Sequence, residues 1–347
     1  MRQKGIDLKF KLIDEKVIIS GYKKGISNNI VIPSEIDIYG KRYKVTSIGE
    51  DAFNGLKSLE SIVIPNTITY IGAGAFTDCD SLTIYCEAFD QPSEWSFYWN
   101  SSVRPVYWGK TQKDIIYRDG LQFLIIDGNA VVTGYTSKMK SDIIIPSTIT
   151  INETRYNVTS IGELAFSSCE SLISIIIPSS VTKIGNFAFL DCGSLTSIKI
   201  PSTIKCVGIS AFNNCDSLNK TEFSDCYYLG NNDNPYLILV SSIDKSIVKS
   251  NIHDKTKIIM PFAFSDCYSL ASITIPSSVI NIGRNAFADC CSLIEINIPI
   301  SVKKIDSCAF IFCSSLTIYC EASSRPSGWN SIWNYSNRPV HWGKIEI

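Results

Sequence analysis

The chain has 347 residues, of which 45% are hydrophobic and 19% are charged, and this composition is typical of a folded protein rather than a disordered one. A formal net charge of -1 and scattered Lys and Arg residues provide no electrostatic field that would concentrate nucleic acid. No apolar run approaches the roughly 18 residues of a membrane helix. Composition therefore argues against a nucleic-acid partner and against membrane insertion.

The chain opens on the stretch MRQKGIDLKFKLID, which lacks the apolar segment of a secretory signal peptide. Two expectations follow for the compartment. Either the protein stays inside a cell, or a leader precedes this sequence.

Two segments that share a sequence pattern are expected to open two modules. Gly21-Tyr22 and Val45–Glu50 recur 113 residues later as Gly134-Tyr135 and Val158–Glu163. Each segment is predicted to begin with a pair of strands. In the second, Asp127-Gly128 between alternating apolar runs predicts a type I′ hairpin, which would cover the first edge of a stack of coils.

An Ala-Phe pair, followed in most copies by Cys, recurs along nearly the whole chain. Five of the seven intervals between successive pairs are 23 residues, which predicts coils of that length. The pairs are Ala52-Phe53, Ala75-Phe76, Ala165-Phe166, Ala188-Phe189, Ala211-Phe212, Ala263-Phe264, Ala286-Phe287 and Ala309-Phe310.

The coil PSSVTKIGNFAFLDCGSLTSIKI shows what each repeat position is expected to do. Leu195, Ile198 and Ile200 have the spacing of a short strand whose alternate side chains face one interior. Phe189 is predicted to be a large anchor in the core, and Cys192 a small apolar residue that fills a corner. A single coil cannot bury its own edge, so stability must come from stacking on neighbouring coils.

A Trp-rich segment occurs twice and is expected to close a stack of coils. Leu82–Lys110 and Leu316–Lys344 share one pattern and hold all six tryptophans. The sequence therefore predicts a short module at residues 1–110 and a longer one at residues 111–347. The first module has few coils, so we expect it to pack against the second.

The interval of 52 residues between Ala211-Phe212 and Ala263-Phe264 contains an insertion. We place it at about residues 224–258. Its apolar run YLILV and its turn-like NNDNP predict a hairpin with an exposed tip at Asn231 to Pro235.

The repeat L-x-x-I-x-I-P-x-x-V-x-x-I-G-x-x-A-F-x-x-C resembles the BspA-like leucine-rich repeat family over most of the chain. Leu56 takes the cysteine position in the first coil and Met260 replaces Gly in the sixth. The resemblance implies a right-handed leucine-rich-repeat superhelix with a parallel β-sheet on its concave face. When the predicted hairpin N-caps and Trp-rich C-caps are added to this superhelix, the expected fold is a β-rich α/β solenoid.

The thirteen cysteines are predicted to be mostly buried thiols rather than disulfides or metal ligands. Their number is odd, no C-x-x-C pair occurs, and seven of them share one repeat position that stacking would place one per layer. These seven are Cys79, Cys169, Cys192, Cys215, Cys267, Cys290 and Cys313.

No catalytic constellation can be assembled from the sequence. His253 and His341 are the only histidines and lie in unrelated elements, and no phosphate-binding or nucleophile motif is present. We therefore predict no enzyme activity, no cofactor and no metal.

Two groups of aromatic residues are candidates for contact with a partner. The strand positions that face solvent are mostly small and neutral, which shifts attention to the tyrosines of the insertion. Tryptophans of the repeated segment can stack against sugars, although their spacing fits a closing cap at least as well. The candidates are Tyr227, Tyr228, Tyr236, Trp95, Trp99, Trp329 and Trp333.

Two functional hypotheses follow from these patterns. The first is a non-enzymatic protein-binding or adhesion scaffold, whose partner would be a host or cell-surface protein. The alternative is a carbohydrate-binding surface module that uses the Trp-rich segments. The resemblance implies a cell-surface or secreted protein, whereas the absence of a leader in these residues and the many thiols favour the interior of a cell.

Overall fold

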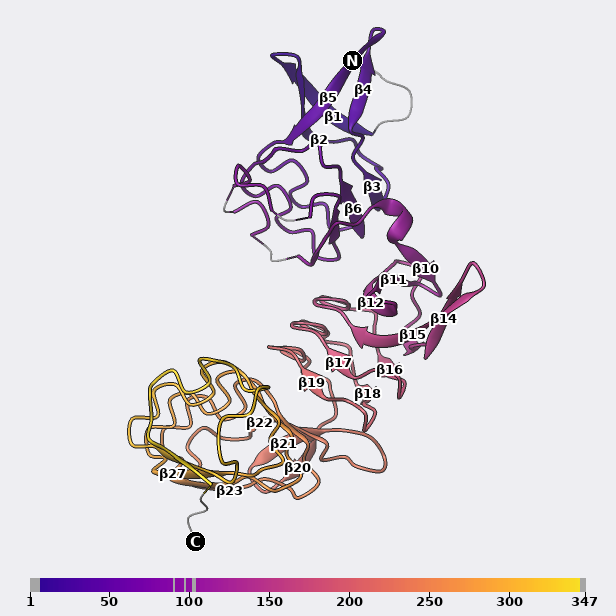
Figure 1. Ribbon diagram of the computed structural model, residues 1–347. Helices are drawn as coiled ribbons and strands as arrows, with labels where there is room; N and C mark the ends of the chain where they lie inside the picture. Colours follow the sequence, from indigo (N-terminus) through magenta and orange to yellow (C-terminus); the bar gives the residue numbers. More distant parts are fainter. Residues whose placement is uncertain (1–6, 90, 97, 102–103, 344–347) are drawn as a thin grey trace. The chain divides into compact units, whose positions relative to one another are not determined.

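The fold is described from a computed structural model that covers residues 7–89, 91–96, 98–101 and 104–343. It divides into two compact units (Figure 1). Unit 1 comprises residues 1–127, 132–139 and 164–169, and unit 2 comprises residues 128–131, 140–163 and 170–347.

Short strands separated by turns make up both units. In chain order up to the second hairpin the elements are β1 (Leu8–Ile13), β2 (Lys16–Tyr22), β3 (Asn29–Val31), β4 (Glu35–Ile38), β5 (Lys41–Ile48), β6 (Ser61–Ile64), β7 (Tyr70–Ile71), β8 (Thr83–Cys86), β9 (Val106–Trp108), a 3-10 helix η1 (Gln112–Asp114), β10 (Ile116–Arg118), β11 (Leu121–Ile126) and β12 (Asn129–Tyr135).

The remaining strands lie in unit 2. They are β13 (Asp142–Ile144), β14 (Thr148–Ile151), β15 (Thr154–Ile161), β16 (Ser174–Ile176), β17 (Lys183–Ile184), β18 (Ser197–Lys199), β19 (Cys206–Val207), β20 (Thr221–Phe223), β21 (Cys226–Leu229), β22 (Ile238–Ser242), β23 (Lys249–Asn251), β24 (Ile258–Ile259), β25 (Ser272–Thr274), β26 (Asn281–Ile282), β27 (Glu295–Ile298), β28 (Lys304–Ile305), β29 (Thr317–Cys320) and β30 (Val340–Trp342).

The predicted coil is confirmed, because equivalent strands of successive coils pair in parallel at the repeat distance. Ile175 of β16 lies opposite Ile198 of β18, and Figure 1 shows these strands as neighbouring rungs. A second wall forms in the same way, where β17 pairs with β19. The chain is therefore a β-solenoid with parallel sheets.

The expected α/β class is not confirmed. Among the described residues the only helix is η1, and turns connect the strands of each coil. The residues between the two walls, such as those from Ile184 to Ser197, form successive turns and no α-helix.

The phenylalanines form the expected rows inside the coils. Phe53 and Phe76 stack with ring centroids 5.5 Å apart in unit 1. In unit 2, Phe287 stacks between Phe264 at 5.3 Å and Phe310 at 5.4 Å. One ring per layer thus forms the centre of each core.

Antiparallel strands precede the coils at several points. β1 pairs with β2, and β2 then runs parallel to β5. The insertion contains the antiparallel pair β21 and β22, and β22 then runs parallel to β24. Asp127 and Gly128, with φ of 48° and 72°, have the left-handed conformation that a type I′ turn requires.

Candidate protein-binding surface

The outer face of the sheet formed by β13, β16 and β18 carries exposed aliphatic side chains. Along β16, Ile175 points into the core while Ser174 and Ile176 point outward. Ile144 is 73% exposed, Ile173 is 46% exposed and Ile176 is 37% exposed. We call the surface formed by these three isoleucines the open sheet face.

Polar side chains border the open sheet face. Ser174 Oγ donates a hydrogen bond of 2.5 Å to Asp142 Oδ1 across neighbouring strands. Ser197 and Lys199 lie next in register on β18 and are exposed. An apolar centre with a polar border is the common arrangement of a protein interface.

The corresponding face of unit 1 is already covered by another part of the chain. The outward residues of β6 and β8 are Ser61, Val63, Thr83 and Tyr85, and none is more than 3% exposed. We call this surface the covered sheet face. Because outward strand positions normally face solvent, their burial requires a packing partner.

Residues that follow the first Trp-rich segment provide this cover. Val63 and Tyr85 belong to one small apolar cluster with Ile115 and Leu124. Tyr85 Oη donates a hydrogen bond of 2.9 Å to Gln122 Oε1 and lies 3.2 Å from Thr133 Oγ1. Burial raises the pKa of Tyr85, so its hydroxyl stays neutral and can donate.

Further polar contacts extend along the edge of the covered sheet face. Glu60 Oε1 accepts a hydrogen bond of 2.7 Å from the Ser137 backbone N–H, and Ser81 Oγ lies 3.3 Å from Tyr135 Oη. The contact therefore combines apolar burial with directed hydrogen bonds. It is an intramolecular example of this sheet face binding a polypeptide segment.

Two of the candidate tyrosines, Tyr227 and Tyr228, lie on β21, and the third, Tyr236, precedes β22. Tyr228 is fully buried, and its hydroxyl accepts a hydrogen bond of 3.3 Å from the His253 backbone N–H. Tyr236 stacks on the His253 ring at 3.7 Å. Tyr227 is half-buried, with Lys220 Nζ 5.7 Å from its ring centroid. The structure thus brings Tyr228 and Tyr236 together and places Tyr227 apart from them.

The four candidate tryptophans lie in the cores of the closing segments. Trp95, Trp99, Trp329 and Trp333 are each 3–4% exposed. Trp329 Nε1 donates to Val302 O at 3.1 Å, and Trp95 Nε1 donates to Ile68 O at 3.4 Å. These rings offer a ligand almost no surface, so their burial does not favour the carbohydrate hypothesis.

The sequence reasoning missed the covered sheet face and undervalued the open one. The solvent-facing strand positions are predicted to be mostly small and neutral, whereas Ile144, Ile173 and Ile176 are exposed here. The signal was present in DIIIP, where alternation places Ile144 outside when Ile143 and Ile145 are inside.

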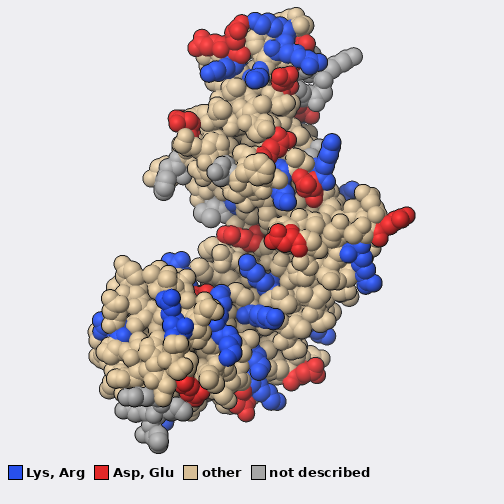
Figure 2. Space-filling model, viewed as in Figure 1, with Lys and Arg blue, Asp and Glu red and all other residues tan. Residues whose placement is uncertain are grey.

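Disulfides, clusters of metal-ligating side chains and membrane-spanning helices are absent from the described residues. All thirteen cysteines are free thiols, and ten of them are buried. Within the described ranges, no group of three or more His, Cys, Asp or Glu residues is placed to hold a metal ion. In the same ranges, no helix has the length and apolar character needed to cross a membrane. Figure 2 shows charges of both signs scattered among uncharged surface.

Stacked 23-residue coils with parallel strands define a repeat protein of the leucine-rich type. The family model described as BspA type leucine rich repeat region matches residues 28–116, 141–232 and 243–332, in six copies. The chain belongs to this family.

Several solved structures are similar to the chain. A leucine rich repeat protein of T. pallidum is 22% identical, with 66% of this chain and 99% of that chain covered and a TM-score of 0.34. A leucine rich cell surface protein from Faecalibacterium prausnitzii is 23% identical, with coverage of 100% and 98% and a TM-score of 0.29. A leucine-rich repeat protein from Eubacterium ventriosum is 20% identical, with coverage of 92% and 95% and a TM-score of 0.38. No curated protein matches the chain.

Proposed function

We propose that this protein is a non-enzymatic scaffold that binds a protein partner, in an adhesion role at a cell surface, through the open sheet face of unit 2. The observation that carries the proposal is the covered sheet face of unit 1. There, the same kind of surface is fully buried against a polypeptide segment through Val63 and Tyr85.

The partner surface is expected to be apolar with a polar border. Burial of a fully exposed Ile side chain contributes about 1.5–3 kcal/mol. Ile144 is 73% exposed and Ile176 is 37% exposed, so each contributes a corresponding part of that energy, and together they can supply the centre of an interface. Asp142 and Lys199 carry opposite charges on this face and would set orientation rather than affinity.

The test measures binding of the purified chain to an array of purified extracellular protein domains. A domain that binds saturably is then measured against the double variant Ile144→Ser, Ile176→Ser. We expect its affinity to fall by about tenfold or more. Ile300→Ser is the matched control, because Ile300 is 61% exposed and lies outside this sheet face.

Two outcomes would contradict the proposal. One is that no protein domain binds saturably. The other is that binding is unchanged in the double variant or falls equally in Ile300→Ser, because the partner would then use another surface.

A further inference from the structure

In several coils, including those of Phe53, Phe189, Phe264 and Phe287, a set of backbone hydrogen bonds joins the residues around the phenylalanine to the next coil. The donors are the amide of the Phe residue and the amides two residues before and after it. For Phe189 these bonds run from Phe187 N–H to Ile209 O (2.8 Å), from Phe189 N–H to Ala211 O (2.8 Å) and from Asp191 N–H to Asn213 O (3.0 Å).

The next coil has no successor that could accept the same bonds. Its donors are the amides of Ser210, Phe212 and Asn214, and no acceptor for them is found among the described residues. The Phe212 ring stacks on Phe189 at 5.4 Å on one side. Where a further coil would follow, the chain instead enters the antiparallel strands β20 to β22.

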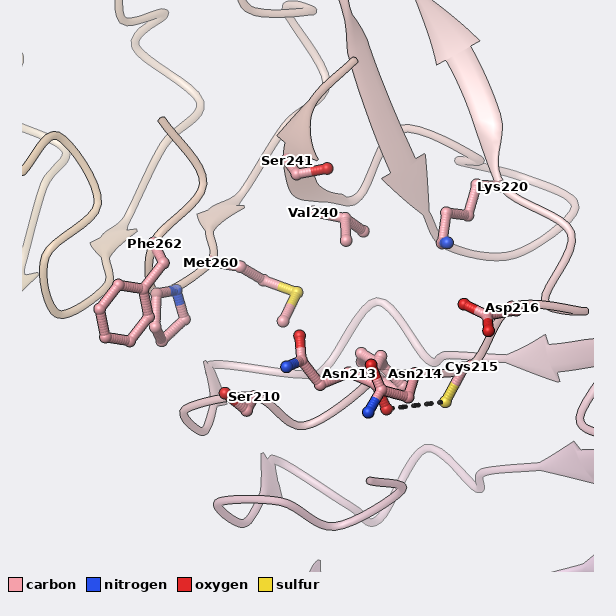
Figure 3. Close-up of a pocket in the computed structure, with 12 residues that line it drawn as sticks. Ser210, Asn213, Asn214, Cys215, Asp216, Lys220, Val240, Ser241, Met260 and Phe262 are labelled. Atoms are coloured by element: carbon pink, nitrogen blue, oxygen red, sulfur yellow. Dashed lines mark hydrogen bonds between the residues drawn. The ribbon is translucent and has the colours of Figure 1, made fainter. Parts of the chain in front are cut away.

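A cavity of about 450 Å³ lies at this interrupted edge. Figure 3 shows Ser210, Asn213 and Asn214 on one side of it, with Val240, Ser241 and Met260 opposite. Its volume lies in the range of about 300–1,000 Å³ that is usual for ligand pockets.

The cavity wall is close to neutral. Asp216 and Lys220 are the charged side chains among its lining residues, and they have opposite signs. The free donors are backbone amides two residues apart, and in the Phe189 coil donors with this spacing are met by backbone carbonyls of the next segment. The chemistry thus favours a neutral polypeptide segment over an anion.

Two other stacks in this chain show what closes such an edge. At the last coil of unit 2, Cys308 N–H donates to Ile332 O at 3.0 Å, and the following residue, Trp333, packs edge-on against Phe310 at 5.9 Å. Phe312 N–H donates to Ser336 Oγ at 3.1 Å. Cys308, Phe310 and Phe312 have the same spacing as the three donors at the interrupted edge.

The first Trp-rich segment repeats this arrangement in unit 1. Gly74 N–H donates to Tyr98 O at 3.0 Å, and Trp99 lies edge-on to Phe76 at 6.0 Å. In both stacks the occupant supplies a backbone carbonyl and, one residue later, an indole ring. The edge at Phe212 has donors at the same spacing without that occupant, and the Phe212 ring, which is 5% exposed, borders the cavity with only a small part of its surface.

We propose that the edge formed by Ser210, Phe212 and Asn214 binds a polypeptide segment of a partner protein. The segment supplies a backbone carbonyl to Ser210 N–H and places an aromatic side chain in the cavity, between Asn213 and Met260. This inference rests on the protein-binding role proposed above and adds a second, distinct surface to it.

The test uses the full chain and a fluorescent synthetic peptide, SGWNSIWNYSN, which copies residues 327–337. We expect saturable binding, and about tenfold or more weaker binding when the second tryptophan of the peptide is replaced by Ala. Hydrogen exchange should show that the peptide slows exchange of the amides at 210, 212 and 214.

A variant that fills the cavity tests whether the peptide binds there. Ser241→Trp is expected to abolish peptide binding, whereas Ser202→Trp, an exposed position on the same stack outside the cavity, should leave it unchanged. Circular dichroism melts establish that both variants are folded. If Ser241→Trp unfolds the protein, the exchange experiment on the unmodified chain decides alone.

Three results would overturn the inference. The first is that the peptide shows no saturable binding, and the second is that Ser241→Trp binds the peptide as tightly as the unmodified chain. The third is slowed hydrogen exchange at residues 308–312, which would show that the peptide displaces the chain's own closing segment. The double variant Ile144→Ser, Ile176→Ser should retain peptide binding, so failure here is distinguishable from failure of the proposed sheet-face role.

Discussion

The repeated cysteine is buried among apolar residues and also makes a hydrogen bond. Cys79 Sγ donates to Phe53 O at 3.2 Å, and Cys290 Sγ donates to Phe264 O at 3.2 Å. Cys313 Sγ makes the same contact with Phe287 O at 2.9 Å. A small side chain with a weak donor therefore satisfies a carbonyl of the preceding coil. The prediction that most cysteines are buried thiols is confirmed.

Burial of the Cys320 thiol, in β29, is expected to make the protein less stable at alkaline pH. Burial raises the pKa of Cys320 to about 12 from an ordinary value of 9.0. Below pH 9 the thiol is neutral in both folded and unfolded chains, so its contribution to stability is fully present. Between pH 9 and pH 12 the Cys320 thiol ionises in the unfolded chain but not in the folded one, so the free energy of unfolding falls.

The measurement is the urea midpoint at pH 8, 10 and 11 in the presence of a reductant. The wild-type midpoint should fall above about pH 9, and Cys320→Ala should lose less over the same interval because it has no thiol to ionise. An identical pH profile for the two proteins would contradict the assigned cause.

At the scale of the coil, the close spacing between layers requires glycine at one repeat position. A Cβ on Gly208 would lie 2.4 Å from the backbone N of Asn186 and 2.4 Å from the carbonyl C of Gly185. Close approach of the preceding coil therefore excludes a side chain at this position.

Gly208→Ala is therefore expected to destabilise the protein by about 1–3 kcal/mol, because the backbone of the neighbouring coil must move. Gly193→Ala is the control, since nothing lies within 4 Å of its added Cβ. Gly193→Ala should change the free energy of unfolding by no more than about 0.5 kcal/mol. Chemical denaturation measures both, and equal effects would show that coil spacing does not determine the loss.

At the scale of the whole molecule, each solenoid is held together by contacts between neighbouring layers. Removing one complete coil should therefore leave a foldable chain. Deletion of residues 276–298 removes 23 residues and joins Ile275 to Pro299. The Phe264 ring would then face Phe310 in place of Phe287, with strand register preserved.

We expect this deletion variant to keep a β-type circular dichroism spectrum and to unfold at a lower urea midpoint. Deletion of residues 276–287 is the control, because losing half a coil brings core positions to the surface. Loss of structure in both variants would argue against layer-by-layer stability, and so would retention in both.

The boundary between the two predicted modules stays a prediction. The sequence placed it at residue 110, from the end of the first Trp-rich segment. In the structure, unit 1 also includes residues 111–127 and 132–139, which contain most of the polypeptide that covers its sheet. Periodicity reports which positions face inward within a coil, but it does not report which outward positions another segment will cover.

The sequence by itself determined the coil, because a 23-residue period of Leu, Ile, Phe and Cys can bury its apolar side chains in only one stacked arrangement. It also determined that the thiols are buried and that the tryptophans fit the closing segments. The interval after Phe212 also located the insertion that interrupts the stack. Only the tertiary structure decided which sheet face is covered and which backbone amides at the interrupted edge are left without an acceptor. These two features depend on contacts between residues far apart in the chain, such as Tyr85 with Gln122, and on backbone amides that every residue carries, so no local pattern encodes them.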